Sequence, residues 1–135
     1  MKRNVFIFLS AILAWIFGIT MMVFPEKMLD NLNGDVSLAT KVVMQWVGVG
    51  IFSIGCMNFI CRNAHGSKSL RAIMAGNIIL HVLGLGFDIF DYSNSFMKGQ
   101  GLVMGGVVHI LMIGGFSYYL IRMKETMLMS SSHKS

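Results

Sequence analysis

Residues 72–91, AIMAGNIILHVLGLGFDIFD, form an apolar run that is interrupted by a regular polar pattern. A helix of about 20 residues spans roughly 30 Å, the thickness of the hydrocarbon core of a bilayer. The polar positions recur at alternating spacings of four and three residues, which places them on one face of a helix. They are Asn77, His81, Gly84, Asp88 and Asp91. Polar groups are costly inside a membrane, so we expect this face to point toward a protein interior or a wet cavity.

The composition of the whole chain favours a membrane protein. Of its 135 residues, 55% are hydrophobic and only 13% are charged, whereas soluble domains are usually about 25% charged. The net charge of +5 is explained by its distribution among the loops, so we expect no nucleic-acid binding. The sequence contains no nucleophile motif, no phosphate-binding Gly-Lys loop and no HExxH pattern. We therefore predict no catalytic residues and lean against an enzyme.

Four apolar runs of similar length predict four transmembrane helices. They cover residues 5–24, 42–61, 72–91 and 101–121. We expect the first run to be a retained span rather than a signal peptide, because it is long and Pro25 ends it without a small-residue cleavage site. The segment Pro25–Lys41 is the longest predicted loop, and the tail from about residue 125 is predicted to be disordered. The expected fold is a single all-α domain over residues 1–135, an integral membrane four-helix bundle with up-down-up-down topology.

The positions of lysine and arginine predict the orientation in the membrane. One side would carry Lys2, Arg3, Arg62, Lys68, Arg71, Arg122, Lys124 and Lys134. The other side would carry Lys27, Lys41 and Lys98. Because cytoplasmic loops are enriched in these residues, we expect both termini to be cytoplasmic.

Small residues indicate where the helices pack closely, as is common in membrane proteins. The expected contact positions are Ala14, Gly18, Gly48, Gly55, Gly105, Gly106, Gly114 and Gly115.

Depth along the predicted helices brings several polar side chains toward the outer half of the bundle. The candidate ligand-binding residues are Gln45, Asn77, His81, Asp88 and His109. Three interpretations of the two histidines stay open: hydrogen bonds across the bundle, the wall of an outward-opening ligand cavity, or ligation of a haem by His81 and His109. His81 and Asp88 lie two helical turns apart, which weakens a metal site shared by that pair.

A Gly followed by Pro-Glu near the end of the first helix (Gly18, Pro25, Glu26) precedes a second helix that is rich in glycine, from Gly48 to Gly55. With a charged inner loop and a polar third helix, this arrangement resembles the small four-helix membrane proteins grouped as DoxX-like. The resemblance covers most of the chain. It implies a possible role as an accessory subunit of a quinone-linked oxidoreductase and implies no particular site residues.

The leading functional hypothesis is an accessory or small-ligand-binding membrane subunit with an outward-facing polar pocket. One alternative is a haem- or quinone-binding component of a membrane oxidoreductase. Another is a proton or cation pathway formed by an oligomer. The expected partners are the lipid bilayer and either a larger membrane complex or further copies of the chain.

Overall fold

The computed structural model describes the backbone of residues 1–132 and the side chains of residues 1–123. This part of the chain contains helices and no strands. The helices are α1 (Arg3–Val23), α2 (Pro25–Asn31), α3 (Leu38–Cys61), α4 (Lys68–Ser93) and α5 (Gly99–Ser132). Among them α1, α3, α4 and the Gly99–Met123 part of α5 are long and apolar enough to cross a membrane. The chain is thus an all-α, multi-pass membrane protein, as its composition predicts.

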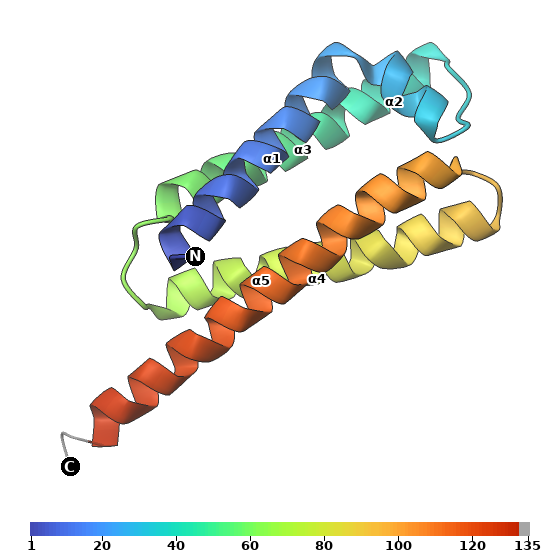
Figure 1. Ribbon diagram of the computed structural model, residues 1–135. Coiled ribbons are helices and arrows are strands. Elements are labelled where there is room, and N and C mark those ends of the chain that lie inside the picture. Colours follow the sequence, from blue (N-terminus) through green and yellow to red (C-terminus); the bar gives the residue numbers. More distant parts are fainter. Residues whose placement is uncertain (133–135) are drawn as a thin grey trace.

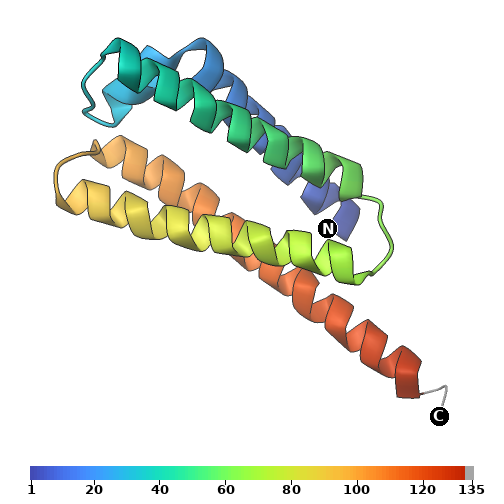
Figure 2. The same cartoon turned by 180° about the vertical axis from the view of Figure 1, so that it is seen from behind.

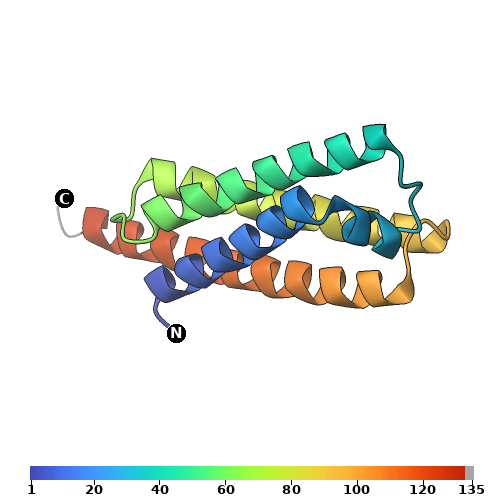
Figure 3. The same cartoon turned by 90° about the horizontal axis from the view of Figure 1, so that it is seen from above.

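The long helices form two antiparallel hairpins, α1 with α3 and α4 with α5, which lie one above the other in Figure 1. The N-terminus, the α3–α4 connection and the C-terminal part of α5 lie at one end of the molecule, called here the basic end (Figure 3). The short helix α2 and the α4–α5 connection lie at the opposite end, as the reverse view in Figure 2 also shows. This up-down-up-down order agrees with the predicted bundle.

Helix α2 lies where the sequence predicts a loop. Pro25 ends α1 as expected, because α1 stops at Val23, but it also occupies the first position of a new helix. Proline is well suited to that position, since its missing N–H would have no partner there anyway. A turn follows α2 at Leu32-Asn33, where Asn33 has a positive φ of 49°.

The helices begin earlier than the apolar runs suggest because polar caps precede them. The hydroxyl of Ser37 accepts a hydrogen bond from the backbone N–H of Thr40 at 3.2 Å, and that of Ser67 accepts one from Leu70 at 3.1 Å. Each cap satisfies a backbone donor that the first helical turn leaves free. Consequently α3 and α4 each start four residues before the predicted spans.

The tail differs from the prediction of disorder after about residue 125. Helix α5 continues through Ser132, and residues 133–135 lie outside the described part of the chain. The segment from Lys124 to Met129 contains good helix formers and neither Gly nor Pro, which allows the helix of the last span to continue.

The first hairpin is closed by glycines, as predicted. A methyl group added to Gly18 would lie 2.8 Å from the carbonyl oxygen of Gly48, and one added to Gly48 would lie 2.7 Å from the carbonyl oxygen of Gly18. Gly55 accommodates the indole of Trp15 in the same way. Gly114 faces open space instead, so this position makes no close contact within the described chain.

A hydrophobic core fills the basic half of the bundle. It consists of Phe6, Ile7, Leu70, Met74, Met112, Phe116 and Met123. The outer surface of the spans is also apolar, with Trp46 71% exposed and Ile60 79% exposed. A soluble protein rarely exposes so much contiguous apolar surface, whereas lipid contact accounts for it.

Candidate functional site

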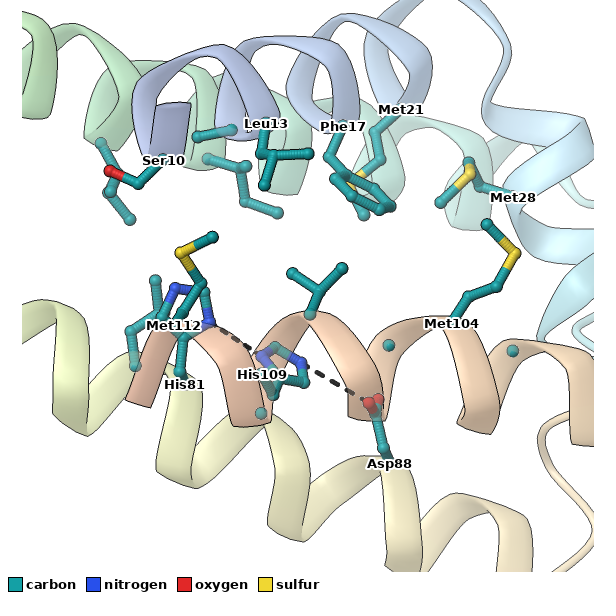
Figure 4. Close-up of a pocket in the computed structure, with 18 of the residues that line it drawn as sticks. Ser10, Leu13, Phe17, Met21, Met28, His81, Asp88, Met104, His109 and Met112 are labelled. Atoms are coloured by element: carbon teal, nitrogen blue, oxygen red, sulfur yellow. Dashed lines mark hydrogen bonds and ion pairs between the residues drawn. The ribbon is translucent and has the colours of Figure 1, made fainter. Parts of the chain in front are cut away.

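A cavity of about 440 Å³ separates the two hairpins. Its volume falls within the range of about 300–1,000 Å³ that is usual for small-molecule sites. Figure 4 shows Leu13, Phe17 and Met21 of the first hairpin on one side, and His81, Asp88 and His109 of the second hairpin opposite them. The cavity extends from the middle of the spans to α2. Four of the five residues on the polar face of α4 line it, namely Asn77, His81, Gly84 and Asp88, and Asp91 does not.

The wall of the cavity is mainly apolar and rich in methionine. The methionines are Met21, Met28, Met44, Met97, Met104 and Met112. Methionine side chains are flexible and polarizable, and they adapt to ligands of different shape.

The histidines and Asp88 form a continuous polar chain along this wall. The Nδ1 atoms of His81 and His109 lie 2.8 Å apart, and Nε2 of His109 lies 3.5 Å from Oδ2 of Asp88. His109 thus connects two residues of α4 that are too far apart to meet directly. Oδ2 of Asp88 is buried and has no hydrogen-bond donor within normal distance among the described residues, which leaves capacity to accept one.

The arrangement of protons depends on the state of the Asp88 carboxyl group. With Asp88 ionised, the carboxylate only accepts hydrogen bonds, and the facing Nε2 of His109 carries a proton. Nδ1 of the neutral His109 ring then accepts the proton of His81 Nδ1, and Nε2 of His81 keeps a lone pair. No described residue hydrogen-bonds that nitrogen, and His81 lines the cavity.

Two glycines make room for this polar chain. A methyl group added to Gly84 of α4 would lie 2.6 Å from Cε1 of His109, and one added to Gly105 of α5 would lie 3.2 Å from Cγ of Asp88. Each helix therefore places a glycine opposite the polar side chain of the other. In each helix that glycine precedes the polar residue by one turn, so Gly84 precedes Asp88 and Gly105 precedes His109.

A second polar cluster lies at the inner end of the cavity, toward the basic half. Asn58 and Asn77 exchange two side-chain hydrogen bonds of 3.0 Å, and Asn58 also donates to the hydroxyl of Ser10 at 3.3 Å. These three side chains are almost fully buried. Asn77 thus lines the cavity as predicted, but its amide is engaged by Asn58, a partner that the sequence analysis leaves out together with Ser10.

Gln45 is not part of the cavity, contrary to the predicted site. Its amide donates to the carbonyl oxygen of Met22 at 3.1 Å and is exposed. The step of about 100° between adjacent residues of a helix explains the difference, since Met44 lines the cavity and its neighbour Gln45 does not. Gln45 therefore stabilises the end of α1.

The end of the cavity that lies away from the basic end is covered by α2 and the α4–α5 connection. The amide of Asn33 donates to Ser95 O at 3.3 Å, the backbone N–H of Lys98 donates to Asn31 O at 3.2 Å, and Lys98 pairs with Asp30 at 3.0 Å. These contacts join the two hairpins over the hollow. The predicted outward-facing pocket thus has a cover that the sequence analysis missed.

The geometry does not fit a haem held between His81 and His109. The facing ring nitrogens lie 2.8 Å apart, whereas two metal–nitrogen bonds of about 2 Å each would require roughly 4 Å between them. Within the described residues no group of three or more His, Cys, Asp or Glu side chains could hold a metal ion.

Comparisons with known protein families, with curated proteins and with solved structures found no match for this chain.

Proposed function

We propose that this membrane protein binds a small, mainly apolar molecule in the cavity between its two hairpins. The observation that carries the proposal is a hollow of about 440 Å³ whose apolar wall contains one connected polar chain, His81–His109–Asp88. Ligand sites usually combine an apolar lining with a few polar groups that fix orientation. Nε2 of His81, as the free end of this chain, would accept a hydrogen bond from the polar group of the ligand.

The same chain can present a donor when it gains a proton. With both nitrogens of His109 protonated, its Nδ1 donates to Nδ1 of His81, and the remaining proton of His81 then lies on Nε2. The site would thus accept from a hydroxyl in one state and donate to a carbonyl in the other. A quinone with its reduced form presents these two groups, which supports the quinone interpretation over the haem interpretation.

The resemblance to DoxX-like proteins supports a more specific form of this proposal, in which the protein binds its ligand as an accessory subunit of a larger membrane complex. We also propose that the basic end, which gathers Lys2, Arg3, Arg62, Lys68 and Arg71, faces the cytoplasm. The covered end of the cavity would then face outward. Labelling of a cysteine introduced at Asn33 from the outside only is the expected result.

Binding can be tested with a cavity-filling variant and a lipid-facing control on the same helix. Val108 lines the cavity, whereas the adjacent Val107 is 53% exposed on the surface of the span. Native mass spectrometry in nanodiscs with decyl-ubiquinone should show binding to the wild type and to Val107→Phe, and loss of binding in Val108→Phe. Equal retention by all three proteins would contradict the proposal.

His81 tests the recognition of the polar group. His81→Phe keeps an aromatic ring in place and removes one hydrogen bond, so affinity for decyl-ubiquinone should fall by about two- to tenfold. Unchanged affinity would show that the histidine pair serves packing alone.

A second candidate is a proton pathway through an oligomer, and the continuous His81–His109–Asp88 chain is the observation that favours it. It predicts a pH-dependent proton flux into liposomes that Asp88→Asn abolishes. Asp91→Asn is the matched control, because Asp91 lies on the same helix and does not line the cavity. Absence of flux in the wild type excludes this candidate.

A further inference from the structure

A groove on the outside of the bundle runs between α3 and α4 and has a volume of about 400 Å³. The residues that line it are Ile54, Met57, Ala72, Ile73, Gly76, Asn77 and Leu80. The groove is apolar, because only one of these seven residues, Asn77, has a polar side chain. From Ala72 to Leu80 it follows α4 for nine residues, or about 12 Å of helix.

The groove lies next to the central cavity. Ile54, Asn77 and Leu80 line both hollows. The shared residues lie where one hairpin meets the other, since α3 pairs closely with α1 and α4 pairs closely with α5. The groove therefore lies on the side of the bundle that would face the hydrocarbon of the bilayer, and the three shared residues stand between it and the cavity.

Gly76 leaves the groove unfilled. A methyl group added there would meet no atom within 4 Å, in contrast to Gly84 on the same helix, where His109 fills the space. Because glycine has no side chain to occupy this part of the groove, a hydrocarbon chain can lie against the backbone of α4.

The polar groups of the two hollows define the chemistry of the occupant. No lysine or arginine lines either hollow, so an anionic headgroup such as phosphate would lack a strong partner. Asn77 is already hydrogen-bonded to Asn58 and Ile73 O, so the groove itself offers no free polar group to a ligand. The groove thus fits hydrocarbon, and the free polar groups lie deeper, at His81 and Asp88.

We propose that the α3–α4 groove holds the hydrocarbon tail of a neutral amphiphile that enters from the bilayer and places a hydroxyl or carbonyl head at His81. This inference rests on the proposed ligand-binding function and adds the ligand class and its route. The tail remains in contact with lipid at Met57 and Ala72, so only the head needs to pass the residues shared with the cavity.

The test uses a decyl-benzoquinone that carries a photoreactive diazirine at the end of its tail. The full chain is reconstituted in phosphatidylcholine nanodiscs, irradiated and analysed by peptide mass spectrometry. The expected result is labelling of Met57, Ala72, Ile73 or Gly76 that an excess of decyl-ubiquinone competes away. Gly76→Phe should lose this labelling. Gly86→Phe, a substitution at another open glycine of α4 outside the groove, should retain it.

The outcomes separate this inference from the proposed function. Competed labelling at Leu13 or Phe17 without labelling of the groove would leave the cavity as a ligand site and overturn the lateral route. If decyl-ubiquinone does not compete with labelling of the groove, the probe occupies the groove only as a nonspecific lipid would. This result would also overturn the lateral route. A dimer of the full chain that native mass spectrometry detects and that Gly76→Phe abolishes would place a second copy in the groove and do the same. No competed labelling anywhere in the wild type would overturn both proposals, and this result does not depend on the folding of any variant.

Discussion

The two hairpins use glycine in different ways. In the α1–α3 hairpin, Gly18 and Gly48 bring one backbone against the other, with each added methyl group meeting a carbonyl oxygen at 2.8 Å or less. In the α4–α5 hairpin, Gly84 and Gly105 admit the side chains of His109 and Asp88 instead. Small residues between membrane helices can thus serve close packing or create space for polar groups.

This difference separates a hairpin that is closed by backbone contact from a hairpin that holds a largely buried carboxylate. Beside its glycines, each hairpin has one buried polar atom without a hydrogen-bond partner among the described residues, the indole nitrogen of Trp15 beside Gly55 in the first and Oδ2 of Asp88 beside Gly105 in the second. Buried polar groups in proteins are normally satisfied. Of these two residues, Asp88 lines the cavity and Trp15 does not, which supports the cavity wall of the second hairpin as the candidate site.

The largest effect is expected from Gly18→Leu. Its side chain would meet backbone atoms of Gly48 and Phe52, which cannot move aside as a flexible side chain can. We expect the free energy of unfolding to fall by about 3 kcal/mol, the upper part of the usual range for overpacking. Gly50→Leu, where the added group faces open space, should remain close to the wild type when unfolding in mixed micelles is followed by circular dichroism. Equal losses at both positions would contradict the close-packing role.

Gly84→Ala should lower stability less and affect the site more. The added methyl group meets the end of the His109 side chain, which can turn away, so the loss of stability should be about 1 kcal/mol. The displaced ring would no longer lie near His81 and Asp88. Nitrogen NMR of the histidine rings should show the loss of the His81–His109 hydrogen bond. Gly86→Ala should leave the spectrum as it is.

The Asn58–Asn77 pair tests how the two hairpins are held together. Its two hydrogen bonds connect α3 to α4 across the boundary between the hairpins. A double-mutant cycle with Asn58→Ala and Asn77→Ala should give a coupling energy of roughly 0.6–1.7 kcal/mol, which runs from the average to the largest value measured for hydrogen bonds between membrane helices. Additive losses would show that the pair contributes no joint stabilisation.

The smallest effect is expected outside the spans, where Glu26 of α2 pairs with Lys41 of α3. The hydrogen bond and charge of Lys41 hold the pKa of Glu26 below its ordinary value. A lowered carboxyl pKa means that the stabilisation is complete above the unfolded value of about 4.3 and is lost as the pH falls through the lowered pKa. Melting curves from pH 7 to pH 3 should therefore converge for the wild type and Glu26→Gln. High salt should reduce the difference at pH 7, because both groups are solvent-accessible.

Much of the fold could be predicted because its signals are local. The apolar runs and Pro25 located the four spans, and the spacing of polar residues placed Asn77, His81 and Asp88 on one face of α4. Helix α2 was missed because a seven-residue helix carries too little apolar pattern to stand out. The caps at Ser37 and Ser67 are sequence signals that would have improved the helix starts.

Part of the candidate site could not be derived in this way. Asn58 and Ser10 join the polar network because their helices rotate them toward α4, whereas rotation turns Gln45 away from it. One sequence signal was available, since Asp88 and His109 each follow a glycine by four residues. That spacing indicates that a glycine leaves free space one turn before a polar side chain. It does not indicate which neighbouring helix places a side chain in that space.

The sequence by itself determined that this chain has four apolar spans and a polar stripe on the third, because hydrophobicity and helical period depend on neighbours along one helix. The tertiary structure decided that His109 connects His81 to Asp88, that Asn58 engages Asn77, and that a hollow remains between the hairpins. Those facts depend on the rotation and register of helices that are distant in sequence. Close packing at glycine fixes the rotation and the register of these helices, and this packing arises only when the helices come into contact.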